Sequence, residues 1–211
     1  KPIRDVREPA LHLLVGGVSY RTAPLALRER LAVPPRDLTN VLRELRTACG
    51  VAEAAILSTC NRVECYLASP HPDDPSSALL DFLSYRSRVR PEALRPHGYR
   101  FADGEAARHL FRVTAGLDSM VLGESEITAQ VKQASLAAHA QGATGPVLNR
   151  LFQKALHGAK VIRSRTGIAE GQASIGSVVV RVVRQMFGGD VQGCEALLWG
   201  AGKAAETTAR H

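Results

Sequence analysis

Short apolar runs and longer helical repeats divide this chain into two patterns. In the first hundred residues, apolar runs at 11–15 and 54–57 end in glycine or polar residues, and the run at 63–68 alternates with a period of two. Both patterns are typical of β-strands. Apolar residues three or four positions apart predict helices between these runs. The predicted strands are 11–15, 54–57, 63–68 and 95–101, and the predicted helices are 25–31, 37–48 and 78–89.

Helical periodicity dominates from residue 103 onward. Asp103 is a candidate N-cap for a helix over 106–115, and the helical pattern continues from 116 to 139. Further helices are predicted over 147–165 and 173–187, and glycine-containing turns join them. Long helices with short connections are typical of a helical bundle packed against the preceding sheet.

The last segment predicts a third kind of unit. An apolar run at 194–199 precedes a Gly-x-Gly-x-x-Ala loop at 200–205, which is typical of the start of a dinucleotide-binding fold. We therefore predict an α+β fold: a small, mainly antiparallel sheet with flanking helices, then a helical bundle, then the opening β-α of a Rossmann-type domain. The predicted divisions are an extension at 1–10, the sheet unit at 11–102, the bundle at 103–190 and a truncated nucleotide domain at 191–211.

Composition narrows the class of protein. The chain has 211 residues, of which 45% are hydrophobic, and no apolar run approaches the roughly 20 residues that span a bilayer. Residues 1–9 are charged and lack the apolar region of a secretory signal, so we expect a cytoplasmic protein without membrane contact. A net charge of +7 suits a polyanionic partner, although the basic residues are spread along the chain.

The cysteines raise the first question of chemistry. Cys49, Cys60, Cys65 and Cys194 form no Cys-x-x-Cys pair and have no histidine cluster beside them, so we expect neither a metal site nor a disulfide framework. Cys60 stands at the end of a predicted strand, two residues before Arg62, whose positive charge favours the reactive thiolate. Free cysteines are often buried as small hydrophobic residues, so both interpretations stay open.

Glu124 is the second candidate for chemistry. On an unbroken helix it falls in one stripe with Leu117, Met120 and Ile127, where a carboxylate is costly unless it is paired. A substrate amine would supply such a partner. Alternatively, Gly123 breaks the helix, and Glu124 is solvated or ion-paired within the protein.

Two motifs resemble those of the glutamyl-tRNA reductase family. Ser-Thr-Cys-Asn-Arg-x-Glu at 58–64 resembles its catalytic-cysteine motif, and 116–132 matches its Gly-Leu-Asp-Ser-x-Val-Leu-Gly-Glu-x-x-Ile-x-x-Gln-Val-Lys motif almost letter for letter. The chain departs from the family at Tyr20, where histidine is usual, and at Ser125-Glu126, where Pro-Gln is usual. The resemblance implies NADPH-dependent reduction of glutamyl-tRNA(Glu) to glutamate-1-semialdehyde through a cysteine thioester, the first step of tetrapyrrole biosynthesis.

The resemblance also implies roles for individual residues. Cys60 would attack the ester carbonyl that joins glutamate to its tRNA, and His109 would act as a base or an orienting group. Arg62 is suited to a bidentate contact with the substrate carboxylate. The implied substrate-binding residues are Thr59, Asn61, Arg62, Ser119, Glu124, Ser125, Glu126 and Gln130, and the implied NADPH-binding residues are Gly200, Ala201, Gly202, Lys203, Ala204 and Ala205.

The resemblance assigns the nucleophile to 11–102, completion of the substrate pocket to 103–190, and only the start of an NADPH domain to 191–211. We therefore expect these residues alone to bind substrate and to form or hydrolyse the thioester, with little reduction. For the complete protein the resemblance implies a homodimer and contact with glutamate-1-semialdehyde aminomutase.

Two competing hypotheses remain. A different cysteine enzyme with a nucleotide domain, related to aldehyde dehydrogenases or acyl-transfer proteins, would leave the motif at 116–132 unexplained. A non-enzymatic tRNA- or partner-binding module related to the reductase would tolerate loss of Cys60, Arg62, His109 and Glu124, and the chain retains all four.

Overall fold

A four-stranded antiparallel sheet forms the centre of the first half of the chain. The computed structural model describes residues 11–70, 75–169, 175–200 and 202–210, so the predicted extension at 1–10 lies outside the described residues. The strand order is β2-β3-β1-β4, and every neighbouring pair is antiparallel. This sheet confirms the predicted fold class. The strands are β1 (His12–Ser19), β2 (Glu53–Ser58), β3 (Arg62–Ser69) and β4 (Tyr99–Ala102).

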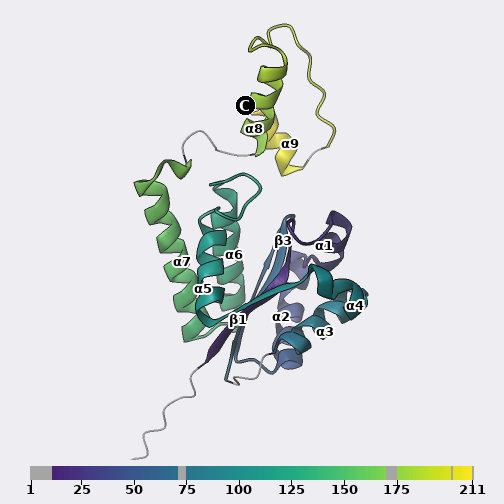
Figure 1. Ribbon diagram of the computed structural model, residues 1–211, viewed down its shortest axis with the longest axis vertical. Helices are drawn as coiled ribbons and strands as arrows, with labels where there is room; N and C mark the ends of the chain where they lie inside the picture. The colour runs from purple at the N-terminus through teal and green to yellow at the C-terminus, as the bar shows by residue number, and fades with distance from the viewer. Residues whose placement is uncertain (1–10, 71–74, 170–174, 201, 211) are drawn as a thin grey trace, which may run out of the picture.

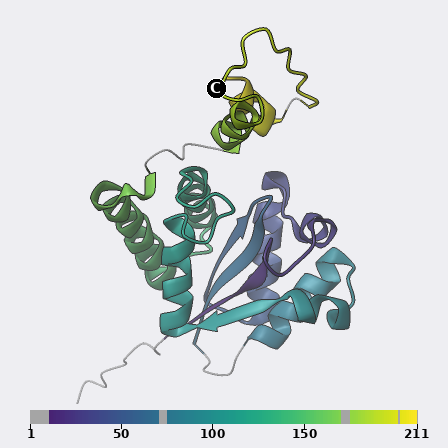
Figure 2. The ribbon, with the colours of Figure 1, turned by 45° about the horizontal axis from the view of Figure 1, so that its top comes forward.

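Helices cover both faces of this sheet (Figure 1). The helices α1 to α4 lie on one side, and α5 to α7 lie on the other, as Figure 2 shows from a second direction. Every residue of β3 is buried, because this strand is central and covered on both faces. The helices that cover the sheet are α1 (Leu25–Leu31), α2 (Leu38–Cys49), α3 (Ser76–Ser87), α4 (Pro91–Leu94), α5 (Asp103–Thr114), α6 (Glu126–Ala140) and α7 (Pro146–Arg165).

Two strand predictions are wrong in their limits. The first strand does not end at residue 15 but continues through Gly16 and Gly17 to Ser19. Glycine is needed at 17 because a Cβ atom there would lie 2.1 Å from the carbonyl oxygen of Val63 on the neighbouring strand. The last strand is shorter than predicted: 91–97 forms helical turns, and β4 begins at Tyr99.

The predicted continuous helix from 116 to 139 is also wrong. Between α5 and α6 lies a loop of residues 115–125, in which Gly116 has φ +76° and Gly123 has φ +77°. These left-handed conformations suit glycine and interrupt a right-handed helix. A Cβ atom at Gly123 would lie 2.2 Å from the carbonyl oxygen of Ile168. The alternative prediction, that Gly123 breaks the helix, is therefore confirmed.

Asp103 does not cap a helix as predicted. It is the first residue of α5, with φ +43°, and the N-cap position is Ala102. The carboxylate of Asp103 instead accepts a hydrogen bond from the backbone N–H of Leu13, at 3.0 Å. Asp103 therefore ties the start of α5 to β1.

The C-terminal segment contains α8 (Ile175–Met186) and α9 (Lys203–Ala209), which contact each other. The predicted strand at 194–199 is not formed, since these residues have no regular structure. A strand is stabilised by backbone hydrogen bonds to a neighbouring strand. Residues 194–199 do not form such a strand, and the side chains of Leu197 and Trp199 are exposed. Within the ranges that the structure describes, no helix has both the length and the apolar character needed to cross a membrane.

Candidate active site

Cys60 lies in the tight turn between β2 and β3. The hydroxyl oxygen of Thr59 accepts hydrogen bonds from the backbone N–H groups of Asn61 and Arg62, both at 3.1 Å. The guanidinium of Arg28 donates to the carbonyl oxygen of Cys60. Cys60 is exposed, whereas Cys65 is buried in the core. The turn therefore presents the Cys60 thiol to solvent, and the interpretation of Cys60 as a buried hydrophobic residue is wrong.

A small cavity beside this turn brings together most of the residues implied by the two motifs. Its volume is about 50 Å³, and one wall comes from the turn and the other from the 115–125 loop and the start of α6. Ser125 and His109, which were also implied, do not belong to its lining, and Ile127 was not foreseen as part of it. The lining residues are Thr59, Cys60, Asn61, Arg62, Ser119, Glu124, Glu126, Ile127 and Gln130.

Helix α7 holds the 115–125 loop in place. The guanidinium of Arg163 donates to the carbonyl oxygen of Gly123 at 3.0 Å and also to the carbonyl oxygen of Glu124. The hydroxyl of Thr128 donates to the carbonyl oxygen of Thr114 at 2.8 Å, which links the start of α6 to the end of α5. These contacts satisfy backbone groups that a loop outside regular structure leaves unpaired. They also fix the loop that carries Ser119.

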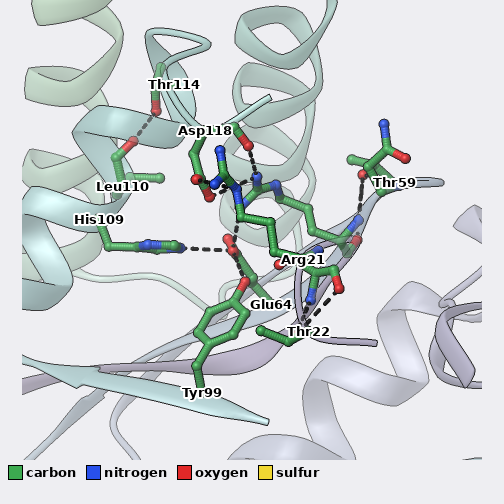
Figure 3. Close-up of polar contacts among 12 residues, drawn as sticks. Arg21, Thr22, Thr59, Glu64, Tyr99, His109, Leu110, Thr114 and Asp118 are labelled. Carbon is green, nitrogen blue, oxygen red and sulfur yellow. Dashed lines mark hydrogen bonds and ion pairs between the residues drawn. The ribbon is translucent and has the colours of Figure 1, made fainter. Parts of the chain in front are cut away.

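Glu64 forms a buried polar cluster behind the turn (Figure 3). Its carboxylate is fully buried and accepts hydrogen bonds from Arg62 at 2.7 Å and from the hydroxyl of Tyr99. The hydroxyl of Tyr66 also donates to it, at 2.6 Å. Nε2 of His109 lies 2.8 Å from the same carboxylate. Burial alone would raise the pKa of Glu64, but the hydrogen bond from His109 and the charge of Arg62 outweigh it and lower the pKa to about 2. Glu64 is therefore ionised at neutral pH.

The guanidinium of Arg62 is held by protein groups on two sides. It donates to Glu64 and, through its other terminal nitrogen, to the carbonyl oxygen of Asp118 at 2.5 Å and the carboxylate of Asp118 at 3.1 Å. Burial would lower the pKa of Arg62, but the adjacent Glu64 raises it above its usual value. For the predicted bidentate contact with a substrate carboxylate, Arg62 would have to share or exchange these protein partners. The sequence did not indicate that Arg62 has them.

His109 reaches the Cys60 turn only through this cluster. Its ring stacks on Phe101, with centroids 4.9 Å apart, and lines a second cavity of about 370 Å³ instead of the cavity beside Cys60. Since an ionised carboxylate can only accept hydrogen bonds, Nε2 of His109 carries a proton when it contacts Glu64. His109 thus contacts Glu64 and does not belong to the lining of the cavity beside Cys60.

The residues implied for NADPH are described only in part. Gly200 has φ +126°, a conformation that suits glycine, and Gly202 occupies the N-cap position of α9. These features fit a glycine loop that leads into a helix. Ala201 lies outside the described residues. In the described part of the chain, no group of three or more histidine, cysteine or acidic side chains could hold a metal ion.

Comparison with known proteins relates this geometry to one family. A family model described as "Glutamyl-tRNAGlu reductase, N-terminal domain" matches residues 16–166. The chain is 42% identical over 201 residues to a glutamyl-tRNA reductase of Syntrophotalea carbinolica. The aligned region covers 95% of this chain and 45% of that protein. It is 44% identical over 199 residues to a glutamyl-tRNA reductase of Desulforudis audaxviator, which covers 94% of this chain and 44% of that protein.

A solved structure agrees with these sequence matches. The chain superposes on the glutamyl-tRNA reductase from Methanopyrus kandleri with a TM-score of 0.68 and 30% identity, which covers 94% of this chain and 45% of that chain. The chain spans about half the length of the curated relatives it matches. The match over 16–166 and the shared fold lead to one conclusion: the chain belongs to the glutamyl-tRNA reductase family.

Proposed function

We propose that this chain is the acyl-accepting part of a reductase that converts glutamyl-tRNA(Glu) to glutamate-1-semialdehyde. The Cys60 thiolate attacks the carbonyl carbon of the ester between glutamate and the 3′ end of its tRNA. A carbon–sulfur bond forms, the carbon–oxygen ester bond breaks, and the 3′ oxygen of the departing tRNA takes up, through solvent, the proton that the Cys60 thiol lost. The product is a glutamyl thioester on Cys60 and a free tRNA.

The observation that carries this proposal is the exposed Cys60 thiol beside polar groups from the 115–125 loop and α6. Glu124 is suited to the ammonium group of the glutamyl moiety, and Ser119 and Gln130 are suited to hydrogen bonds with its polar atoms. The Thr59 hydroxyl oxygen accepts two backbone hydrogen bonds in the turn, and both Thr59 and Cys60 line this cavity. Asn61 and Glu126 are also proposed to bind the substrate, and Ser125 is proposed to do so from outside the cavity lining. Arg62 is proposed to share its charge between Glu64 and the substrate.

Reduction belongs to the complete protein. When NADPH is bound, it supplies the hydride that converts the thioester to the aldehyde and releases Cys60. Gly200, Ala201, Gly202, Lys203, Ala204 and Ala205 are the proposed start of its pyrophosphate site, where backbone N–H groups at a helix N-terminus favour phosphate. A homodimer, a contact with glutamate-1-semialdehyde aminomutase and a cytoplasmic location are proposed for the complete protein on family grounds.

Transfer of labelled glutamate tests the proposal. Glutamyl-tRNA charged with labelled glutamate is mixed with the chain without NADPH, and protein-bound label is followed after an acid quench. We expect label on the wild type and on Cys194→Ser, which alters the other exposed thiol, but none on Cys60→Ser. Hydroxylamine should release the label, because it cleaves thioesters. A folded wild-type protein that neither takes up label nor accelerates ester hydrolysis would favour the binding-module hypothesis.

A further inference from the structure

A second cavity shares the buried Glu64 cluster with the Cys60 site. Its volume is about 370 Å³, and Asp118 in its lining pairs with Arg62, which lines the cavity beside Cys60. We call it the arginine cavity, because three exposed arginines from β1–α1 and α5 contribute to it. Its lining residues are Ser19, Arg21, Thr22, Tyr99, Phe101, Glu105, Arg108, His109, Arg112 and Asp118.

The charges in the arginine cavity do not cancel. Arg21 pairs with Asp118 at 3.2 Å, and Arg108 pairs with Glu105 at 3.2 Å. Arg112 is exposed, and its guanidinium has no hydrogen-bond or ion-pair partner among the residues that the structure describes. Three guanidinium groups face two carboxylates, so the lining carries one net positive charge before His109 is counted.

This charge and these donors suit a phosphodiester. A phosphodiester carries one negative charge, whereas a phosphomonoester carries nearly two near neutral pH. Arg108 and Arg112 are four residues apart on α5 and therefore lie on the same face of that helix. Guanidinium groups bind phosphate oxygens through two parallel hydrogen bonds, which makes arginine well suited to this contact.

We propose that the arginine cavity binds a backbone phosphate of the tRNA 3′ strand while the glutamyl group lies at Cys60. This inference rests on the proposed function, which requires the 3′ end of a tRNA beside the Cys60 turn. The cavity is linked to that turn by the Asp118–Arg62 pair. Arg108 and Arg112 are the residues that contact the phosphate, and Arg21 is held beside them by Asp118.

Binding of uncharged tRNA(Glu) at several salt concentrations tests the inference. In Arg108→Gln/Arg112→Gln we expect the Kd to rise about tenfold and the slope of log Kd against log salt to fall by about 0.7 for each lost single-strand phosphate contact. The matched control is Arg36→Gln/Arg43→Gln, which removes two exposed arginines from the turn at Pro35–Asp37 and from α2, a helix on the opposite side of the sheet from α5 (Figure 1). This control should change the Kd less than about twofold. Arg112→Lys keeps the positive charge at position 112. It should therefore retain most of the salt dependence that Arg108→Gln/Arg112→Gln loses.

Acylation with two substrates separates this inference from the proposed function. The 3′-glutamyl ester of adenosine has no phosphate, so Arg108→Gln/Arg112→Gln should slow Cys60 acylation by glutamyl-tRNA but not by this ester. Equal losses with both substrates would make the cavity part of the glutamyl site and would overturn the inference. Unchanged tRNA binding by Arg108→Gln/Arg112→Gln would also overturn it. So would a variant that loses affinity only for inorganic phosphate or NADPH and keeps its affinity for tRNA. Failure of the wild type to be acylated by either substrate would instead contradict the proposed function.

Discussion

Glu64 determines the arrangement behind the Cys60 turn without touching the cavity itself. It lies in a strand whose residues are all buried, and four side chains donate to its two oxygens. A buried carboxylate is stable only when its charge is paired and its lone pairs are satisfied. Glu64 therefore fixes the position of Arg62, which is two residues after the proposed nucleophile.

Glu64→Gln tests this dependence through stability. Glu64→Gln leaves the buried Arg62 with Asp118 as its remaining carboxylate partner, so we expect the free energy of unfolding to fall by about 3 kcal/mol at pH 7. Urea unfolding measures this change. Glu44→Gln is the control, because the Glu44–Arg86 pair is partly exposed and should contribute no more than about 1 kcal/mol.

The pH dependence of the same variant follows from the lowered pKa of Glu64. A carboxyl group whose pKa is lower in the folded state stabilises the protein above its unfolded pKa, and the effect is lost as pH falls through the folded pKa. For Glu64 this window runs from the ordinary value of 4.5 down to about 2. The difference in unfolding free energy between wild type and Glu64→Gln should therefore shrink across this window. A difference that stays constant would contradict an ionised Glu64.

At the scale of elements, the active site depends on a loop that a helix elsewhere holds in place. Arg163 on α7 donates to two carbonyl oxygens of the 115–125 loop and lies 3.4 Å from the hydroxyl oxygen of Thr128. Gly123 packs so closely against Ile168 that no side chain fits there. The loop that brings Ser119 and Glu124 to Cys60 is therefore positioned by α7 and the turn after it.

Arg163→Gln tests whether the position of the 115–125 loop affects acylation while the reactivity of the Cys60 thiol stays the same. We expect acylation of Cys60 by glutamyl-tRNA to slow at least tenfold, because the loop carries part of the cavity lining. Alkylation of Cys60 by iodoacetamide should change little, since the turn between β2 and β3 is held by its own hydrogen bonds. Arg165→Gln, at an exposed position in the same helix, is the control. Equal acylation rates for both variants would contradict a positioning role for Arg163.

The sequence predicted those elements whose stabilising contacts lie nearby in the chain. The strand–turn–strand around Cys60 was predicted correctly, since its apolar pattern and turn are local. The continuous helix over 116–139 was predicted wrongly, and only the alternative, a break at Gly123, indicated the interruption between α5 and α6. The strand at 194–199 was predicted wrongly, because its formation depends on a neighbouring strand that an apolar run does not reveal.

The candidate site was predicted less completely than the fold. The structure brings Thr59, Cys60, Ser119, Glu124 and Gln130 from the two motifs together around one cavity. The partners of Glu64 were not predictable, since Tyr99 and His109 are 35 and 45 residues away and their contact depends on the packing of β4 and α5 against β1 and β3. A carboxylate within an otherwise apolar strand was the available signal that a buried ion pair exists there.

At the scale of the whole molecule, Cys60 is the proposed acyl acceptor and the glycine loop at 200–205 is the proposed start of a nucleotide site. The chain spans about half of its curated relatives. We therefore predict that residues 1–211 form little or no glutamate-1-semialdehyde from glutamyl-tRNA and NADPH, although they form the thioester. Trapping of the aldehyde product would measure this, with the longer reductase of Syntrophotalea carbinolica as the positive control. NADPH-dependent aldehyde formation by these residues alone would contradict the proposed division of labour.

The most direct test of the central claim is to locate the glutamyl group on the protein. The chain would be mixed with glutamyl-tRNA without NADPH, quenched in acid, digested and mapped by mass spectrometry. We predict a hydroxylamine-sensitive glutamyl adduct on the peptide that contains Cys60, and none on Cys49, Cys65 or Cys194. An adduct on another cysteine, or an unmodified Cys60 in a protein that consumes the ester, would contradict it.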